Sequence, residues 1–287
     1  MKPLVGELIF CDRCGDALTD QAGSLACSTC GRSIPVQDGI PLFTPLPEGL
    51  RPSEKLARGP DVGTPWRKAN WRFLAQQAAK LKQGAVILDV GAGRGDFAGL
   101  FQDRPGYLAL DIYPYPEVDI VCDFTLANPF RESSFDAILL MNVLEHVYDT
   151  HAMLARLTKL LKPGGVLVVA IPFLVKMHQT PVDFARYTHY ALQNFGPQHG
   201  LAVAHLEGFY DPVSVLAEGI GNLKNAVMPE VKGPRHYFAR LLAWGLQTNA
   251  SLLRGVLGPG SVSPPGSMRS QAPTGYHIVY RKAVEDL

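Results

Sequence analysis

The chain has 287 residues, of which 47% are hydrophobic and 18% charged, and its 27 Lys and Arg nearly balance 26 Asp and Glu. Its length predicts about two domains. The balanced charge excludes a protein that binds nucleic acid through a basic surface along its whole length, and the apolar fraction excludes a disordered chain. The longest internal apolar run, residues 166–175, is about half of what crosses a bilayer. With no export signal visible, we expect a cytoplasmic protein.

In chain order, the pattern predicts a small N-terminal module, residues 1–46, and a Pro/Gly-rich linker, residues 47–64. A helix is expected over residues 65–83. Apolar strands are then expected at 85–90, 106–111, 118–122, 135–141 and 165–171, with helical segments at 95–104, 149–161 and 187–198. The last of these strands follows a helix stop and a turn at residues 162–165. Two further strands, 201–209 and 275–282, enclose residues 211–274, which we expect to form a helical cap.

Strands that alternate with helices indicate βαβ units. We therefore expect an α/β fold with a mostly parallel, Rossmann-like sheet and helices on both of its faces. Residues 65–210 and 275–287 would form this domain, and the cap would be an insertion before the last strand.

Four of the five cysteines form two CxxCG knuckles, Cys11–Cys14 and Cys27–Cys30. Four thiolates in a tetrahedral arrangement suit Zn²⁺, and a closed four-ligand site is structural rather than catalytic. A module of this size has too small a core of its own, so a metal ion would stabilise it. The alternative is a set of free thiols or a redox CxxC pair. Cys122 is expected to be a core residue.

A glycine-rich loop follows a buried strand at residues 86–95. Its spacing, with Gly91, Gly93 and Gly95, departs from the dinucleotide-binding fingerprint. Asp89 precedes the first glycine, where a carboxylate fits poorly beside a pyrophosphate but would attract a cationic amine. Asp111 ends the next strand and can accept the two hydroxyls of a ribose.

Asp123 and Phe124 end the third strand, where an acid and an aromatic ring can hold an adenine. An amine, a ribose and an adenine without phosphates describe S-adenosylmethionine (SAM). The segments 86–95, 108–111, 135–147 and 160–172 resemble the class I SAM-dependent methyltransferases of the type 11 subgroup. With that resemblance, the expected cofactor residues are Asp89, Gly91, Ala92, Gly93, Gly95, Asp111, Ile112, Asp123, Phe124 and Asn142.

The N-terminal module resembles the zinc-ribbon domain of the small tRNA-methyltransferase activator proteins, with a similar ending from Leu25 to Phe43. It is also similar to the N-terminal zinc finger of an rRNA guanine methyltransferase group. That group usually has a histidine in place of the last cysteine, whereas this chain keeps Cys30.

Ligands of open α/β sheets lie beyond the carboxyl ends of the strands, so residues after the fourth and fifth strands are candidates for catalysis. The connection 172–189 is rich in titratable and aromatic residues. We expect His178 to be a general base, with Asp183 or His146 as its orienting partner or rival. The alternative is that Asp183 and Arg186 pair to brace the loop.

The leading hypothesis is a SAM-dependent methyltransferase that acts on a small-molecule or glycan-type acceptor, with O- or N-methylation. The second is an RNA methyltransferase that grips its substrate with the zinc ribbon. The third is a SAM-binding module that serves a partner without catalysis. The cap would cover a substrate, form a dimer face, lie on a membrane surface through a basic amphipathic helix, or simply pack on the sheet edge.

Overall fold

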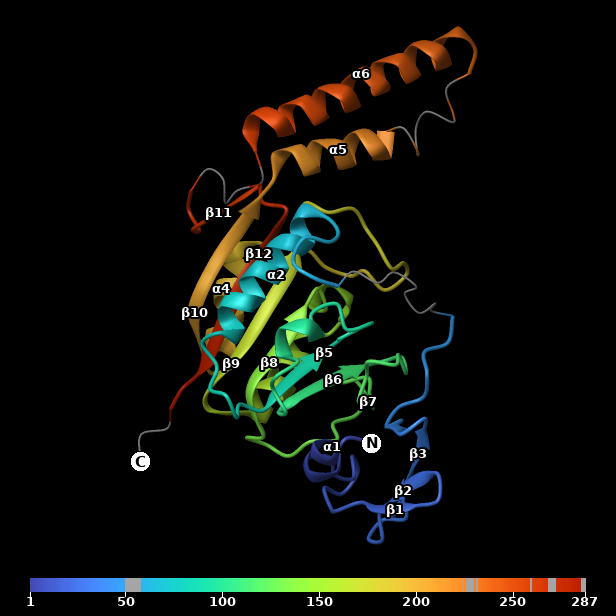
Figure 1. The fold of residues 1–287 in the computed structure, drawn as a ribbon, viewed down its shortest axis with the longest axis vertical. Helices are drawn as coiled ribbons and strands as arrows, with labels where there is room; N and C mark the ends of the chain where they lie inside the picture. Colours follow the sequence, from blue (N-terminus) through green and yellow to red (C-terminus); the bar gives the residue numbers. More distant parts are fainter. Residues whose placement is uncertain are drawn as a thin grey trace.

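The computed structural model describes residues 1–49, 58–223, 225, 230, 232–258, 260–267 and 272–284. Residues 50–57 of the expected linker, short parts of the cap and the last three residues lie outside these ranges. In Figure 1, a small blue N-terminal unit lies beside one edge of a long twisted sheet, and two orange helices extend beyond one end of that sheet.

The N-terminal unit is a short helix followed by a small antiparallel sheet. Helix α1 spans Pro3–Leu8, and the strands are β1 Thr19–Gln21, β2 Ser24–Ala26, β3 Ser33–Gln37 and β4 Ile40–Pro41. They pair in the order β1-β2-β3-β4. The strand–turn–strand expected near residues 34–43 corresponds to β3 and β4. Helix α1, which the sequence pattern did not predict, begins at a proline and buries Val5.

The large sheet has eight strands in the order β11-β10-β12-β9-β8-β5-β6-β7. Their bounds are β5 Ile87–Val90, β6 Tyr107–Asp111, β7 Ile120–Val121, β8 Phe135–Met141, β9 Leu161–Pro172, β10 Leu201–Tyr210, β11 Ser261–Ser263 and β12 Gly275–Lys282. Strands β5 to β9 are parallel. Strand β12 is antiparallel to both β9 and β10. The Rossmann-like α/β fold class with a mostly parallel sheet is therefore confirmed, and β12 and β11 are its antiparallel strands.

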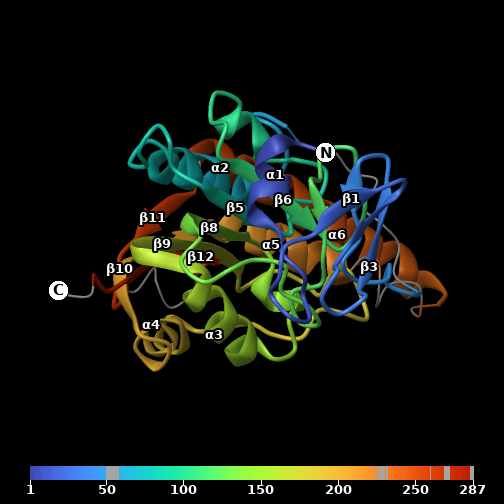
Figure 2. The same cartoon turned by 90° about the horizontal axis from the view of Figure 1, so that it is seen from below.

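Helices cover both faces of the sheet, as Figure 2 shows from below. Helix α2, Pro65–Ala78, lies on one face, while α3, Thr150–Leu160, and α4, His189–Gln198, lie on the other. Helix α2 ends five residues before the predicted limit. The helix expected at 95–104 was wrong: only a 3-10 turn forms, Ala98–Phe101. Gly95 at φ +71° and Gly99 weaken helix formation there.

The turn expected at residues 162–165 was also wrong, because β9 already begins at Leu161, which pairs with Phe135. A shift in the pairing register follows, and it absorbs the lysine, proline and two glycines that read as a terminator in the sequence.

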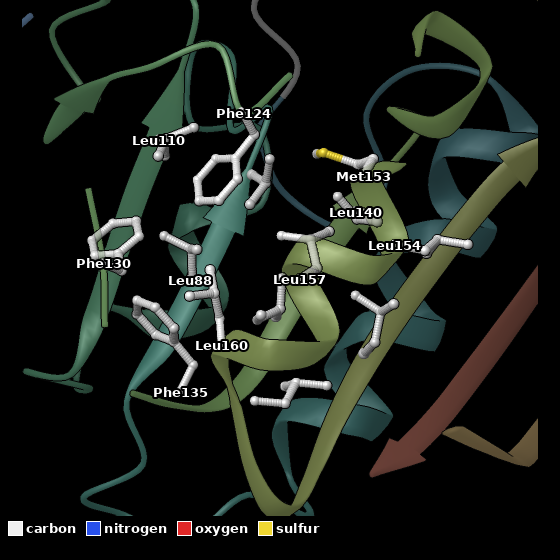
Figure 3. Close-up of a cluster of buried hydrophobic side chains, with 14 of the residues drawn as sticks. Leu88, Leu110, Phe124, Phe130, Phe135, Leu140, Met153, Leu154, Leu157 and Leu160 are labelled. Atoms are coloured by element: carbon white, nitrogen blue, oxygen red, sulfur yellow. The ribbon is translucent and has the colours of Figure 1, made fainter. Parts of the chain in front are cut away.

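The main core lies between the sheet and helices α3 and α4 (Figure 3). Leu88 and Leu140 of the central strands meet Leu154 and Leu157 of α3 there. This cluster also includes buried side chains of the N-terminal unit: Val5, Ile9, Leu25, Ile34 and Phe43. The small unit thus completes its core by packing against the larger one, which compensates for its few apolar residues.

The segment before the last strand forms two helices and a short strand. Helix α5 spans Pro212–Asn222, α6 spans Pro234–Leu257, and β11 pairs with the end of β10. The helices lie side by side beyond the sheet in Figure 1. No helix among the described residues has the length and apolar character needed to cross a membrane.

Candidate functional site at the carboxyl edge of the sheet

The glycine loop leaves β5 at the carboxyl edge of the sheet and turns sharply under its neighbours. Gly91 has φ +74° and Gly93 has φ +55°, values that residues other than glycine rarely adopt. A Cβ at Gly91 would come within 2.6 Å of Cγ2 of Val143, the second residue after β8. The loop can therefore approach the end of β8 only because glycine occupies this position.

Asp111, the last residue of β6, ties this loop to the next one. Its carboxylate accepts hydrogen bonds from the backbone N–H groups of Gly93 at 2.8 Å and Tyr113 at 3.0 Å. Burial raises the pKa of Asp111, and the backbone N–H groups oppose that rise. The glycine loop and the expected ribose acceptor thus form a single hydrogen-bonded unit.

Asp89 is more deeply buried than its expected role implies. It is 2% exposed and accepts a hydrogen bond of 2.6 Å from the hydroxyl of Tyr107. Burial is the largest cause that raises the pKa of Asp89 to about 7, while the hydrogen bond from Tyr107 acts to lower it. A positive charge beside Asp89 would favour its ionised form.

The other expected cofactor positions differ in their surroundings. Asp123 accepts hydrogen bonds from the backbone and hydroxyl of Thr125 and is partly exposed, as is Ile112. Ala92 is buried in the cluster beneath helix α2. Phe124 is 3% exposed and lies in the main core, 6.0 Å from the ring of Phe130 (Figure 3). Its ring face is therefore covered by protein in this structure.

Asn142, directly after β8, has φ +59° and is held by helix α2. Its side-chain oxygen accepts from the indole of Trp66 at 2.9 Å, and the amide of Asn70 lies 3.5 Å away. The Asn70 oxygen is 2.8 Å from Nε2 of His277, which is fully buried between aromatic rings. Sequence reasoning missed this support; a polar Asn and a His inside apolar elements were the only signals.

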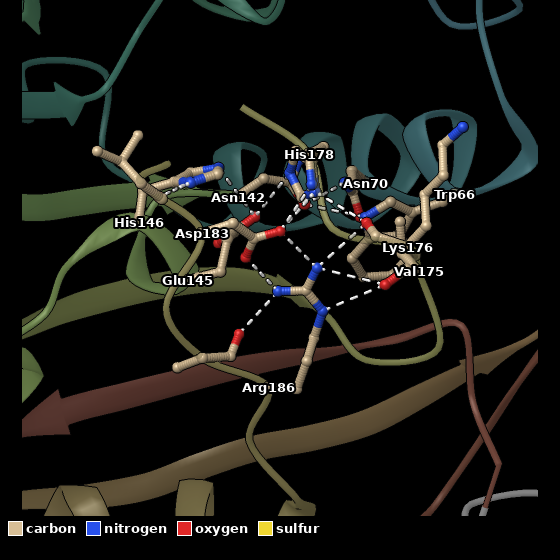
Figure 4. Close-up of polar contacts among 12 residues, drawn as sticks. Trp66, Asn70, Asn142, Glu145, His146, Val175, Lys176, His178, Asp183 and Arg186 are labelled. Atoms are coloured by element: carbon tan, nitrogen blue, oxygen red, sulfur yellow. Dashed lines mark hydrogen bonds and ion pairs between the residues drawn. The ribbon is translucent and has the colours of Figure 1, made fainter. Parts of the chain in front are cut away.

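The connection between β9 and α4 is braced by an ion pair. Arg186 binds both oxygens of Asp183, at 2.5 and 2.8 Å, and this lowers the pKa of Asp183 to about 2. The same carboxylate accepts from the backbone N–H of His178 at 2.8 Å, and Nδ1 of that ring lies 3.3 Å from it (Figure 4). The brace considered from the sequence therefore exists, and it also positions His178.

Glu145 and His146 lie in the 3-10 turn Leu144–His146 after β8, and both face the ring of His178. Oε1 of Glu145 lies 3.8 Å from Nε2 of His146 and 3.8 Å from Nε2 of His178. Glu145 is fully buried, and burial raises its pKa to about 8. All three predicted catalytic residues, His146, His178 and Asp183, are thus neighbours at this edge, and Glu145 joins them.

The four cysteines of the two knuckles converge in the N-terminal unit. Sγ of Cys11 is 3.5 Å from Sγ of Cys30, and Sγ of Cys14 is 3.4 Å from Sγ of Cys27. Sulfur atoms around a tetrahedral zinc ion with bonds of about 2.3 Å are about 3.8 Å apart. The donor set and its spacing therefore fit a zinc ion.

The N-terminal unit reaches the carboxyl edge of the large sheet through the residues that follow β4. Leu42 bridges Val121 of β7, and the backbone N–H of Phe43 donates to the carbonyl of Val121. The hydroxyl of Thr44 accepts from the backbone N–H of Asp123 at 2.9 Å. The unit thus holds the strand end that carries Asp123.

Comparison with known proteins places these features in a wider group. Residues 66–205 match a family model described as a methyltransferase domain. A demethylmenaquinone methyltransferase of Renibacterium salmoninarum is 30% identical over 140 residues, covering 42% of this chain and 59% of the relative. A tRNA U34 carboxymethyltransferase of Syntrophotalea carbinolica is 33% identical over 130 residues, covering 39% of each chain.

Among solved structures, phosphoethanolamine N-methyltransferase 2 of Haemonchus contortus, in complex with S-adenosyl-L-methionine, has a TM-score of 0.45 and 15% identity. The match covers 75% of this chain and 52% of that protein. The chain spans about half the length of the curated relatives that it matches. Five adjacent parallel strands with an antiparallel strand beside β9 give the chain a Rossmann-like α/β sheet, in which residues 66–205 are similar to a methyltransferase domain.

Proposed function

We propose that this protein is a SAM-dependent methyltransferase that acts on a small-molecule or glycan-type acceptor. The observation that carries the proposal is the hydrogen-bonded unit of Gly93 and Asp111, in which a glycine-rich loop and a carboxylate lie at the same edge of the sheet. The methyltransferase-domain match over residues 66–205 and the methyltransferase relatives support it independently.

When bound, SAM supplies a methyl group on a positively charged sulfur. In this proposal, the open backbone around Gly91 and Gly93 lies against the cofactor and Asp111 accepts its ribose hydroxyls. Asp89 provides negative charge for the amine, and Asp123 with Ile112 borders the adenine. Asn142, fixed by Trp66 and Asn70, marks the end of the cofactor site nearest the acceptor.

Methyl transfer depends mainly on alignment, and a hydroxyl acceptor must also lose its proton. The side chains for that task are His178 and His146, which lie beyond the ends of β8 and β9. Nδ1 of His146 lies 2.6 Å from the carbonyl of Val182. Since a carbonyl only accepts hydrogen bonds, Nδ1 carries the proton, and Nε2 keeps a lone pair. Asp183 positions His178. A histidine nitrogen with a free lone pair can accept the proton of a hydroxyl acceptor, and this arrangement favours O-methylation.

We further propose that the cysteine quartet holds a structural zinc ion. The four thiols contact one another in two pairs, Cys11 with Cys30 and Cys14 with Cys27, and a bound zinc ion would hold them as thiolates. Through Thr44, the ribbon would then stabilise the strand end next to Asp123.

RNA remains the second candidate acceptor, because one relative is named as a tRNA carboxymethyltransferase. The two acceptor classes differ in salt dependence: methylation of RNA would fall steeply with added salt, since phosphate contacts release counterions. The third hypothesis, binding without catalysis, predicts SAM affinity with no methyl transfer to any acceptor.

Calorimetric titration with SAM and with NADH tests the cofactor. We expect micromolar binding of SAM, none of NADH, and loss of the SAM signal in Asp111→Ala. NADH binding, or no SAM binding by folded protein, would refute the proposal. For the acceptor side, His178→Ala should depress turnover while SAM affinity is retained, and the exposed His151→Ala serves as the matched control.

A further inference from the structure

Three side chains beyond the ends of β8 and β9, those of Glu145, His146 and His178, form a cluster (Figure 4). One ligand atom from each of Glu145, His146 and His178 lies within 4.8 Å of the others. In the part of the chain that the structure describes, the two carboxyl oxygens of Glu145 have no hydrogen-bond partner. Nε2 of His146 has none either. A fully buried carboxylate without any partner is costly, so its surroundings call for explanation.

Both rings present a lone pair to Glu145. Nδ1 of His146 faces the carbonyl of Val182, and Nδ1 of His178 faces the carbonyl of Lys176 and the carboxylate of Asp183. These partners accept hydrogen bonds, so each Nδ1 carries the proton and each Nε2 is free to bind a cation. This is the arrangement in which metal-binding histidines are held by a second layer of carboxylate and carbonyl groups.

We propose that Glu145, His146 and His178 bind a divalent metal ion of the zinc type, distinct from the ion at the cysteines. Two histidines and a glutamate are a typical catalytic zinc set, and three ligands leave one position open. Ligand atoms around such an ion are about 3.4 Å apart for bonds of about 2.1 Å. The two distances of 3.8 Å are too long for hydrogen bonds and close to that spacing.

This inference rests on the proposed methyltransferase function and refines it. The acceptor's hydroxyl oxygen would occupy the open position, where the ion lowers its pKa and the proton passes to water. The oxygen then forms its bond to the methyl carbon as the carbon–sulfur bond breaks, and S-adenosylhomocysteine leaves. His178 thus acts on the acceptor through the ion rather than by taking its proton directly.

The test counts zinc ions per chain after equilibrium dialysis of the full-length protein against micromolar Zn²⁺. We expect Glu145→Gln and His178→Asn each to lose one ion per chain relative to wild type, while the exposed controls Glu132→Gln and His151→Asn lose none. An unchanged far-UV circular dichroism spectrum shows that each variant is folded, and the ion at the cysteines is retained. Equal zinc content in wild type and Glu145→Gln would overturn the metal site. Because binding is counted directly, this result is independent of whether any methyl transfer is detected.

A second inference comes from helix α6, which presents its apolar side to solvent. Among the described side chains of α6, those that are buried are small, Ala243 and Ala250, and α5 packs beside it. The following large apolar residues are more than half exposed: Tyr237, Phe238, Leu241, Leu242, Trp244, Leu252, Val256 and Leu257. A globular helix normally shows the reverse pattern, so this face is expected to be covered by another surface.

The charges indicate which surface. The sequence from residue 232 to residue 284 contains no Asp or Glu, while Lys232, Arg235 and Arg240 lie at the start of α6. Arg254 is paired with Asp211, before α5. Two copies of α6 packed together would bring arginines near each other without compensating acids. An anionic membrane surface compensates them and accommodates the exposed Tyr and Trp rings at its interface.

We infer that α6 lies on anionic lipid membranes with its apolar face inserted. The placement also concerns the site, because α5 starts at the end of β10, the same edge of the sheet as the ends of β8 and β9. The carboxylate of Glu218 in α5 accepts from the backbone N–H of Lys176, two residues before His178. The membrane surface would therefore lie beside the acceptor loop, which suits an acceptor dissolved in lipid.

Sedimentation with vesicles tests this inference. We expect binding to phosphatidylglycerol-containing vesicles, and at least tenfold weaker binding to phosphatidylcholine alone. The double variant Phe238→Ser/Leu241→Ser should bind at least tenfold more weakly to anionic vesicles. The control Leu126→Ser changes an exposed apolar residue outside α6 and should bind as wild type does. Binding unchanged in the double variant would overturn the inference. So would a stable dimer in solution that this variant dissociates.

Discussion

Replacement of Asp89 by Asn removes a buried charge while keeping shape and one hydrogen-bond acceptor for Tyr107. The pKa of Asp89 is raised from 3.8 to about 7, mainly by burial. The folded protein therefore holds a proton that the unfolded chain releases. Stability is lost as the pH rises from about 4 to about 7 and then stays constant.

The size of the effect follows from the two pKa values. A difference of about three pH units at about 1.4 kcal/mol per unit gives an upper value of about 4 kcal/mol. Asp89→Asn should therefore be close to wild type in stability near pH 4 and more stable by up to about 4 kcal/mol at pH 8. Urea unfolding at several pH values measures this difference, and the exposed Asp103→Asn serves as the control.

A stability difference that does not change with pH would refute the burial argument for Asp89. The same variant separates stability from function. If Asp89 attracts the amine of SAM, the more stable variant binds SAM more weakly at pH 8. Such an opposition between stability and binding is expected where a site keeps an unfavourable charge for its ligand.

Three further outcomes are expected. Asp111→Ala should weaken SAM binding in calorimetry by roughly 10- to 160-fold for each charge-assisted hydrogen bond that it removes, since such a bond contributes about 1.5–3 kcal/mol; unchanged affinity contradicts the ribose assignment. Cys14→Ser should release one zinc ion per chain and expose residues 1–46 to proteolysis; a full metal content contradicts the quartet. Gly91→Ala should lower the unfolding free energy by about 1–3 kcal/mol, because of its φ of +74° and the contact with Val143; an unchanged urea midpoint contradicts the close approach.

The N-terminal unit and the large sheet share one hydrophobic core. The unit's apolar side chains belong to the same cluster as those of α3 and the central strands. Because Phe43 and Thr44 hydrogen-bond the end of β7, loss of the metal site is expected to reach the cofactor edge as well as the ribbon. SAM affinity measured in Cys14→Ser would reveal this coupling.

The sequence alone determined the parts that depend on local patterns. Apolar runs predicted strands β5 to β10 and β12 with small errors at their ends, because buried strands must be apolar. Strand β11, within the segment expected to be a helical cap, was not predicted. Turn glycines and strand-end acids predicted where a ligand edge lies, and paired CxxCG knuckles predicted a cluster of cysteines, because these features follow from short-range backbone geometry.

Only the tertiary structure decided which side chains meet. The buried Glu145, the lone pairs of His146 and His178, and the support of Asn142 by Asn70 and His277 depend on segments far apart in the chain. Phe124 lies in the core for the same reason: its burial is set by Phe130 and the helices around it, not by its position after a strand. Likewise, α6 was visible as an apolar, basic helix, but which of its faces meets solvent depends on how α5 packs against it.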